Sequence, residues 1–371
     1  MTNAPQSKRR KPPARKDKPM VEQSKIEWTD HTFNPWEGCQ KVAPECDHCY
    51  AENRDQRFTG GIHWGPKAPR RRTSAQNWNK PRRWNAQAEA FHATHGRRQR
   101  VFCASLADVF DNAVDTSWRD DLWALIRECN QMDWLMLTKR PQNIAKMLPP
   151  DWGNGWPHVW LGTSAGTQKT ADQNIPHLLS VPARMRFLSC EPMLGAMKLP
   201  RVDFHCDLCG GTGILARFPK GKCHHCNGKG YIPAISTDPK FGTPSTPMRS
   251  IDWVICGGES GPNARPMHPD WARDLRTQCT TAGVAFFFKQ WGNWTAEIDR
   301  DKDDPDWRAN YSKANRDGWA ILNAEGGTGF HGDRVHLMKR VTKEAAGRSL
   351  DGQQWNEVPR GPLEGDAPCQ P

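Results

Sequence analysis

The sequence predicts an α/β protein whose parallel sheet curls toward a partial (β/α) barrel. Short apolar segments alternate with amphipathic segments along the chain, which is the pattern of parallel strands joined by right-handed helical crossovers. Several apolar segments end in polar residues or glycines, as strands do where loops build a site at the carboxyl edge of a sheet. A chain of 371 residues can bury such a core without disulfide bonds.

The individual elements follow from hydrophobic periodicity. Continuous apolar runs predict buried strands at 100–105, 133–140, 158–164, 185–193, 252–261 and 284–292. Apolar residues at helical spacing predict helices over 117–129 and 268–283, the second of which ends at a glycine. Because strands and helices alternate in this way, the strands are expected to be parallel.

Polar residues and glycines recur at the ends of the predicted strands. They are Ser105, Thr138 and Lys139, Thr163 and Ser164, Ser189 and Glu191, Gly257 to Glu259, and Lys289 and Gln290. The carboxyl ends of parallel strands converge on one edge of a sheet, so these residues predict a ligand site there.

The composition excludes a membrane-spanning protein. Hydrophobic residues make up 36% of the chain, and no apolar run approaches the ~20 residues that a membrane helix needs. The amino terminus is basic, but no apolar stretch follows it, which is not the pattern of a secretory signal. We therefore expect a cytoplasmic protein without a membrane partner.

The chain divides into a main domain, one insert and two tails. Residues 1–24 are rich in Lys, Arg and Pro and predict a disordered basic arm, and residues 360–371 predict a disordered tail. Residues 25–198 and 251–359 make up the predicted α/β barrel domain. Residues 199–250 interrupt it with two cysteine pairs and a Pro/Ser/Thr-rich run, and are expected to be an inserted module.

The insert carries the pattern C-x2-C-x-G-x-G twice, as CDLCGGTG and CHHCNGKG. Its cysteines can place four thiolates around one structural zinc ion, Zn²⁺, with no open position for catalysis. An auxiliary iron–sulfur cluster is the alternative. Glycine accepts the positive φ of a sharp turn after each pair. The ligands are Cys206, Cys209, Cys223 and Cys226, and the turn glycines are Gly211, Gly213, Gly228 and Gly230. The pattern resembles the zinc-binding repeats of the DnaJ chaperone family, which has four repeats, so a chaperone role is not expected.

Three further cysteines are spaced Cys39-x6-Cys46-x2-Cys49. Three thiolates suit a [4Fe–4S] cluster in which one iron stays free to chelate a small molecule. They equally suit a Cys3His zinc site completed by His48 or His31, and the spacing alone does not decide between the two. The six-residue spacer must fold back on itself, for which Gly38 and Pro44 are suitable.

Basic residues gather with tryptophans in one stretch of a chain whose net charge is +11. Within residues 63–100, Lys and Arg alternate with Trp64, Trp78 and Trp84, and cations beside flat rings suit a phosphate backbone with exposed bases. A solvated basic surface is the alternative. The candidate nucleic-acid contacts are Arg70, Arg71, Arg72, Lys80, Arg82 and Arg83, with Lys139 and Arg140 at a strand end.

The chain resembles a phage-encoded family of three-cysteine-motif radical SAM-like proteins, which is distantly similar to spore photoproduct lyase. The matching stretches run from about residue 25 to 359 outside the insert, and include KIEWTDHTFNPWEGC, CDHCYAE, LTKRP, VWLGTS, RFLSCEPMLG and IDWVICGGESG. One departure is the spacer of six residues between Cys39 and Cys46, where most radical SAM proteins have three.

The resemblance implies a radical SAM barrel in which Cys39, Cys46 and Cys49 hold a [4Fe–4S] cluster. The cluster would bind S-adenosyl-L-methionine and, with an electron from a donor such as flavodoxin or ferredoxin, form a 5′-deoxyadenosyl radical. The strand ends would then form the cofactor pocket, with Ser105 and Asp108 near the methionine end, Thr163 and Ser164 near the ribose, and Glu191 and Glu259 as further polar anchors. Tyr50 and Cys190 are candidate hydrogen-atom donors on chemistry alone.

The basic stretch and the phage setting together favour DNA as the substrate. The specific hypothesis is an isomerisation or rearrangement of an amino-acid-modified thymidine in phage DNA, in the cytoplasm of the infected host, as a hypermodification that protects the genome from restriction. A base in a duplex would have to be extruded to reach the pocket. The alternatives are DNA repair of the spore photoproduct lyase type and a non-enzymatic, zinc-dependent DNA-binding protein.

Overall fold

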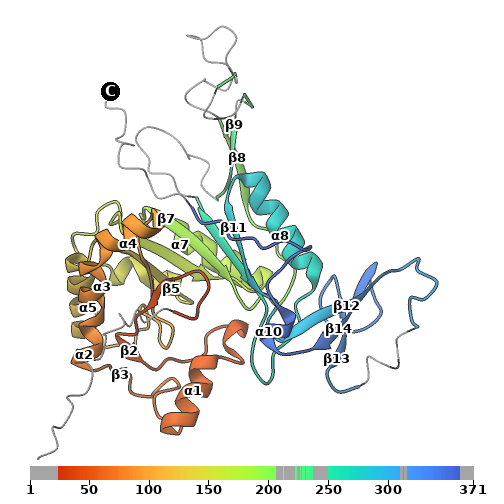
Figure 1. Ribbon diagram of the computed structural model, residues 1–371, viewed down its shortest axis with the longest axis horizontal. Coiled ribbons are helices and arrows are strands. Elements are labelled where there is room, and N and C mark those ends of the chain that lie inside the picture. Colours follow the sequence, from red (N-terminus) through yellow and green to blue (C-terminus); the bar gives the residue numbers. More distant parts are fainter. Residues whose placement is uncertain are drawn as a thin grey trace, which may run out of the picture.

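Seven parallel strands form the main sheet, in the order β1-β4-β5-β6-β7-β10-β11, and the sheet curves into a half-barrel (Figure 1). The computed structural model describes residues 24–205, 212, 222–223, 226, 228–229, 231–236, 250–309, 312 and 316–359. The strands are β1 (His31–Thr32), β4 (Arg100–Cys103), β5 (Asp133–Thr138), β6 (Val159–Ser164), β7 (Met185–Cys190), β10 (Trp253–Gly257) and β11 (Ala285–Gln290). The six predicted strands and the α/β class are confirmed.

Helices connect the strands, and apolar residues of the longer ones, such as Leu122, Ile175 and Leu275, pack with the sheet in one core. They are α1 (Tyr50–Thr59), α2 (Ala75–Trp78), α3 (Lys80–Ala86), α4 (Ala88–His95), α5 (Thr116–Glu128), α6 (Ile144–Met147), α7 (Gln168–Leu179) and α8 (Pro269–Ala282). The predicted helices at 117–129 and 268–283 correspond to α5 and α8. Helix α5 begins where the Asp115 side chain accepts a hydrogen bond from the Ser117 N–H, and α8 ends at Gly283 in the left-handed conformation.

The two faces of the sheet bury different side chains. Alternate strand residues such as Val101 and Leu188 pack with the helices in one large core. The residues between them, including Phe102, Phe187 and Trp253, pack with one another and with Trp28, which precedes the first strand. The Trp28 and Phe102 rings lie 4.8 Å apart. This aromatic cluster fills the inner face of the half-barrel.

A second sheet follows the barrel and was not anticipated from the sequence. Strands β12 (Trp294–Asp301), β13 (Trp319–Asn323) and β14 (Arg334–Arg340) pair antiparallel in the order β12-β14-β13, and a short helix α10 (Lys343–Ala346) follows (Figure 1). In the second half of β12, from Ile298 to Asp301, half-buried and exposed residues alternate. One side of this strand therefore faces solvent, which is typical of antiparallel sheets.

The predicted insert, residues 199–250, contains a two-stranded antiparallel ladder. Strand β8 (Arg201–His205) pairs with β9 (Tyr231–Ile235), and the ladder points away from the main sheet (Figure 1). Cys223 and Cys226 are buried, and the Gly228 N–H donates to the Cys223 carbonyl at 3.0 Å.

The turn geometry in the insert confirms one predicted glycine role, since Gly228 has a φ of +80°. Several sequence expectations lie outside the described residues: the ligands Cys206 and Cys209, the glycines Gly211, Gly213 and Gly230, residues 1–23 of the predicted arm 1–24, and the tail 360–371. The zinc ion stays a prediction. Among the helices that the structure describes, none is both long and apolar enough to cross a membrane.

Candidate cofactor site at the carboxyl end of the sheet

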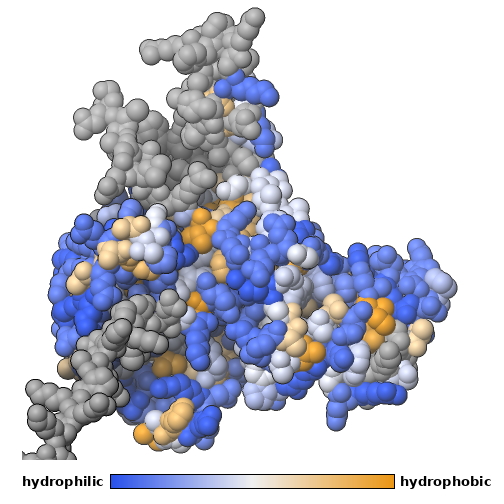
Figure 2. Space-filling view, in the orientation of Figure 1, coloured by the Kyte–Doolittle hydropathy of each residue, from blue (hydrophilic) through white to orange (hydrophobic). Residues whose placement is uncertain are grey.

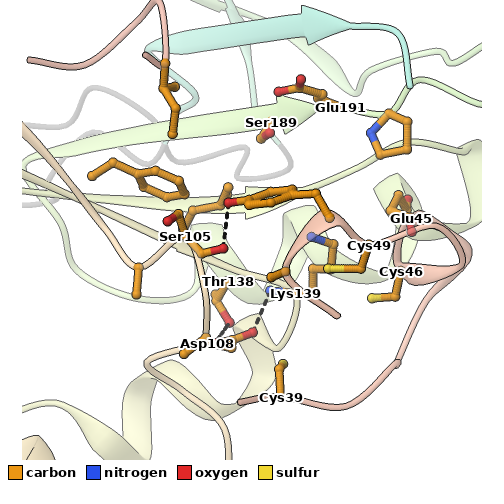
Figure 3. A pocket seen from close by; sticks show the side chains of 18 of the residues that line it. Cys39, Glu45, Cys46, Cys49, Ser105, Asp108, Thr138, Lys139, Ser189 and Glu191 are labelled. Carbon is orange, nitrogen blue, oxygen red and sulfur yellow. Dashed lines mark hydrogen bonds between the residues drawn. The ribbon is translucent and has the colours of Figure 1, made fainter. Parts of the chain in front are cut away.

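One cavity of about 530 Å³ opens at the carboxyl ends of the parallel strands and brings the three predicted cluster ligands together. Cys39, Cys46 and Cys49 all line it (Figure 3). The opposite part of its wall carries Ser189 and Glu191 from the end of β7 (Figure 3). The cavity lies within the 300–1,000 Å³ that is typical of cofactor and ligand sites.

The backbone around Cys39 is fixed by two neighbouring loops. Cys39 follows strand β2 (Trp36–Glu37), which pairs with β3 (Arg71–Arg72). The Gly38 N–H donates to Leu106 O at 3.1 Å, and Cys39 O accepts from the Gly65 N–H at 2.9 Å. Gly38 has a φ of +105°, and a Cβ there would lie 2.5 Å from His63 O. Only glycine fits this turn, which agrees with its expected role in folding the spacer back.

The second half of the spacer is held by Glu45. Pro44 begins a 3₁₀ helix (Pro44–Cys46), as a residue with a fixed φ can. The Glu45 Oε1 atom accepts hydrogen bonds from the Gly166 N–H and the Thr170 hydroxyl, both at 2.6 Å. These bonds join the cysteine loop to the amino end of α7, so the position of Cys46 depends on a helix more than a hundred residues away.

Glu259 fastens the loop from the other side. Its carboxylate accepts from Arg265 at 2.7 Å and contacts His48 Nδ1 at 3.0 Å. Arg265 also donates to Asp47 Oδ2 and to Pro44 O, at 3.0 Å each. Burial would raise the pKa of Glu259, but the hydrogen bonds from Arg265 and His48 outweigh it and lower that pKa. The predicted polar anchor Glu259 therefore positions the cysteine loop as well as lining the cavity.

Beneath the cavity, Arg140 and Asp108 form a buried ion pair next to Cys39. Arg140 Nη1 donates to Asp108 Oδ2 at 2.9 Å and to Cys39 Sγ at 3.5 Å. Asp108 also accepts from the Thr138 hydroxyl at 2.7 Å and from the Lys139 N–H at 3.0 Å. Burial and the Asp108 charge raise the pKa of the Cys39 thiol to about 11, while Arg140 opposes them. Metal binding at Cys39 would therefore release a proton.

Lys139 supplies a second cation to the same corner. It lines the cavity beside the cysteines (Figure 3). Burial opposes the charge of its ammonium group, but Cys46, Cys49, Asp108 and Cys39 outweigh burial and raise its pKa. Its ammonium group has no hydrogen-bond partner among the residues that the structure describes. Lys139 and Arg140 would therefore stabilise a negatively charged group bound by the thiolates of Cys39, Cys46 and Cys49.

The wall of the cavity offers several polar groups from other strand ends. The Tyr50 hydroxyl donates to Ser105 O at 2.6 Å, and the Ser105 hydroxyl accepts from the Asn34 side chain at 3.1 Å. Lys289 Nζ donates to Glu191 Oε1 at 2.6 Å. All of these except Asn34 line the cavity. The structure thus brings together the predicted residues Ser105, Asp108, Glu191 and Glu259.

Thr163, Ser164 and Cys190 do not line this cavity. Thr163 is fully buried, and its hydroxyl donates to Thr138 O at 2.9 Å. Ser164 pairs with Ser189 in the strand register but is itself buried. Cys190 belongs to the core between sheet and helices. Alternation of side chains along β7 explains Cys190, which points to the opposite face from its neighbour Ser189.

The candidate nucleic-acid residues separate into buried and exposed groups. Arg70 forms a buried ion pair with Asp111 at 2.8 Å, and Arg140 is buried against Asp108, so neither offers a surface to a phosphate. Lys139 lies in the cavity wall. The remaining candidates keep exposed or half-buried side chains: Arg71 paired with Glu37, Arg72 with Asp121, Arg82 with Glu128, and then Lys80 and Arg83.

Two of the tryptophans are not exposed stacking surfaces. Trp78 and Trp84 are each 8% exposed and belong to the core. Trp78 donates to Pro35 O at 3.2 Å, and Trp84 stacks on His31 with the rings 4.3 Å apart. Helices α2 and α3 are amphipathic, so they present their basic residues outward and bury their aromatic ones. Trp64 lies at the cavity wall.

The two histidine candidates for a zinc site differ in placement. His31 does not line the cavity, and its Nε2 contacts Gln99 Oε1 at 3.1 Å. His48 does line it, and its Nδ1 contact with Glu259 is the carboxylate–histidine arrangement common at metal sites. Three thiols and one imidazole are the donor types of both a three-cysteine cluster and a Cys3His zinc ion, but the ligand atoms of these residues do not all lie within 4.8 Å of one another, as a zinc ion would need.

Sequence reasoning missed Glu45, Arg265 and a separate histidine pair. His268, Asp270 and His336 place potential metal-binding atoms within 4.8 Å of one another. His268 caps α8 by accepting from the Asp270 N–H, and its ring lies 4.5 Å from that of His336. Burial and His336 lower the pKa of His268 to about 4. The HPDW stretch was a signal for the cap, but nothing in the sequence indicated His336 as its neighbour.

Fold and site together define an α/β half-barrel protein with a three-cysteine cavity at the carboxyl ends of its strands. The chain belongs to a family described as "Protein of unknown function (DUF5131)", whose model matches residues 23–359. Comparison with curated proteins and with solved structures gave no match.

Proposed function

We propose that this protein is a radical SAM enzyme of isomerase or lyase type that acts on a nucleobase of viral DNA. The observation that carries the proposal is the placement of Cys39, Cys46 and Cys49 on one wall of a cavity in a parallel half-barrel. When bound there, a [4Fe–4S] cluster with S-adenosyl-L-methionine would supply a 5′-deoxyadenosyl radical able to abstract hydrogen from an unactivated carbon.

The donor set fits a cluster that keeps one iron open. Cys39, Cys46 and Cys49 line the cavity, and no other cysteine of the described residues does, so a cluster there would have three protein thiolates. Arg140 and Lys139 lie beside the sulfurs and would stabilise the negative charge of a thiolate-bound cluster. Both cations follow β5 directly, so the loop after this strand sets the charge beside the cysteines.

The rest of the cavity suits an organic ligand above such a cluster. Its lining joins apolar side chains, among them Phe102 and Leu137, to the Glu191–Lys289 ion pair. Ser105 and Tyr50 are held at the rim by hydrogen bonds to neighbouring groups. A partly apolar pocket with a few fixed polar groups can orient a ligand and keep water from a reactive intermediate.

We propose DNA as the substrate because the chain is basic and several of its arginines are exposed at the surface. Arg71 and Arg72 on β3 and Arg82 and Arg83 on α3 remain at the surface, and the net charge of the chain is +11. The form we propose is isomerisation of an amino-acid-modified thymidine in phage DNA. Repair of a thymine lesion would use the same cavity, and substrate assays separate the two.

Anaerobic reconstitution with iron and sulfide tests the proposal. We expect about four irons per chain at the three-cysteine site and, with a strong reductant, formation of methionine and 5′-deoxyadenosine. Cys39→Ala, Cys46→Ala and Cys49→Ala should each lose the iron and the product, whereas Cys129→Ala, a buried cysteine remote from the cavity, should keep both.

The competing zinc-dependent DNA-binding protein has a distinct result. A colourless protein with zinc at Cys39, Cys46 and Cys49, and no cleavage of S-adenosylmethionine after reconstitution, would contradict the enzyme and favour that alternative. If 5′-deoxyadenosine forms but mass spectrometry shows no change in the nucleosides of modified or plain DNA, the protein is a radical SAM enzyme whose substrate is not DNA.

A further inference from the structure

Helix α1 and the turn after it form an arm that leaves the cavity rim and returns to it. Tyr50, the first residue of α1, lines the cavity, and so does Trp64, which follows the turn. The helix between them has ten residues, which gives the arm a length of roughly 15 Å. Figure 1 shows α1 standing apart from the main sheet. We refer to residues 50–64 as the α1 arm.

The tip of the α1 arm exposes two large apolar side chains. Phe58 is 69% exposed and Ile62 is 60% exposed. Two other highly exposed apolar side chains of the described residues, Val42 and Tyr50, lie in the same part of the chain. Figure 2 shows apolar colour at the lower edge of the molecule, where Figure 1 draws α1. Such a concentration next to a cavity marks a surface that contacts a partner.

The tip is rigid because its polar groups are satisfied internally. The buried carboxylate of Asp55 accepts from the Thr59 hydroxyl at 2.7 Å and from the His63 N–H at 3.1 Å. Gly60 and Gly61 have φ values of +73° and +81°, which close the turn tightly. Phe58 and Ile62 are therefore presented on a fixed edge, as insertion between bases requires.

The surroundings of the tip carry positive charge. The Arg54 and Arg57 guanidinium groups each lie 5.5 Å from the centre of the Phe58 ring. Arg57 has no carboxylate partner among the described residues, and Arg54 shares the single carboxylate of Glu37 with Arg71. An apolar edge flanked by two arginines, of which Arg57 lacks a carboxylate partner among the described residues and Arg54 shares one, matches the chemistry of a stacked, polyanionic duplex better than that of an apolar protein groove.

We propose that Phe58 and Ile62 form a wedge that enters a DNA duplex and unstacks the base destined for the cavity. This inference rests on the proposed function, because a base in a duplex must leave the stack to reach Cys39, Cys46 and Cys49. The arginines would hold the phosphates on either side, while Phe58 or Ile62 would occupy the place of the extruded base. The α1 arm thus connects the DNA surface to the cavity rim.

A duplex containing 2-aminopurine, whose fluorescence rises when it is unstacked, tests the wedge without any radical chemistry. The wild-type holoprotein should raise the fluorescence on binding. The double variant Phe58→Ala/Ile62→Ala should lose most of that rise, at least about threefold, while binding the duplex nearly as well, because the phosphate contacts remain. Tyr231→Ala, an exposed aromatic on β9, is the matched control and should behave as wild type.

Three other results would contradict the wedge or assign the surface to another partner. A full fluorescence rise in the double variant overturns the wedge, and so does loss of its iron, since the two residues would then act through the cysteine loop. If the variant instead loses reduction by a flavodoxin while unstacking is intact, the surface belongs to the electron donor and the wedge is overturned. Cleavage of S-adenosylmethionine by wild type without DNA is measured in parallel, so failure of the proposed function appears separately.

Discussion

Arg140 Nη1 lies 3.5 Å from Sγ of Cys39, and the same nitrogen lies 2.9 Å from Oδ2 of Asp108. The side chains of Arg140 and Asp108 are only 5% and 7% exposed. A cysteine proposed as a metal ligand is thus held against a desolvated ion pair at the base of the cavity. The pair can support the ligand only while both partners are present, because a lone buried charge is strongly unfavourable.

Replacing Arg140 by methionine should therefore lower the free energy of unfolding by about 3–5 kcal/mol, since Asp108 would be left buried without its partner. Urea denaturation measures this. Arg127→Met is the control, because its ion pair with Asp151 is about half exposed and should contribute at most about 1 kcal/mol. Equal losses in the two variants would contradict a special role of the buried pair.

Glu259→Gln should loosen the cysteine loop, because the neutral amide weakens the bonds to His48 and Arg265 and leaves Arg265 with Asp47 as its one carboxylate partner among the described residues. Hydrogen exchange of a peptide spanning residues 44–49 should become faster. Glu297→Gln, on the exposed side of β12, should leave the exchange of that peptide unchanged. Unchanged exchange in Glu259→Gln would show that Glu45 is sufficient to hold the loop.

Gly38→Ala should disrupt the turn before Cys39. The new Cβ would lie 2.5 Å from His63 O at a φ of +105°, so backbone must move. Gly96→Ala is the control for the effect of positive φ alone, since Gly96 has a φ of +66° with open space around it. It should lower the free energy of unfolding by about 1 kcal/mol. Gly38→Ala should lower the stability measured by thermal unfolding by more than Gly96→Ala does, and it should bind less iron. Equal stability and equal iron content in the two variants would refute the steric argument.

The His268 and His336 pair should make the fold sensitive to mild acid. The groups around it are Asp270, Asp299 and Arg334. The pKa of His268 is about 4 in the folded state against 6.5 ordinarily, so the unfolded chain binds more protons between these values. Stability should be complete above pH 6.5 and fall by about 3 kcal/mol as the pH drops to 4.

His268→Asn checks the source of that acid sensitivity. Asparagine can still cap α8 but does not titrate. Urea midpoints measured at pH 7 and pH 5 should differ less in this variant than in wild type. An undiminished difference would assign the acid sensitivity to other groups.

Zinc content tests the insert. Cys223→Ser/Cys226→Ser should lose about one zinc ion per chain by elemental analysis while the iron bound at Cys39, Cys46 and Cys49 is retained. Zinc that persists in the double variant would show that the two buried cysteines are not its ligands.

The sequence by itself determined the strands and the ends at which the cavity forms. The apolar runs at 133–140 and 185–193 became β5 and β7, because a buried parallel strand needs continuous apolar residues whatever surrounds it. The cysteine spacing determined which residues could be ligands together, and Gly38 and Pro44 already indicated the fold-back of their loop.

Tertiary structure decided which polar residues face the cavity and which charges are neutralised. In one basic tripeptide, Arg70 is buried on Asp111, which lies 41 positions away, whereas Arg71 and Arg72 stay at the surface. Thr163 looked equivalent to Ser189 at a strand end, yet one hydroxyl is buried in the sheet and the other lines the cavity. Local pattern encodes burial and periodicity, whereas the partner of a charge or a hydroxyl depends on distant segments that meet only when the chain folds.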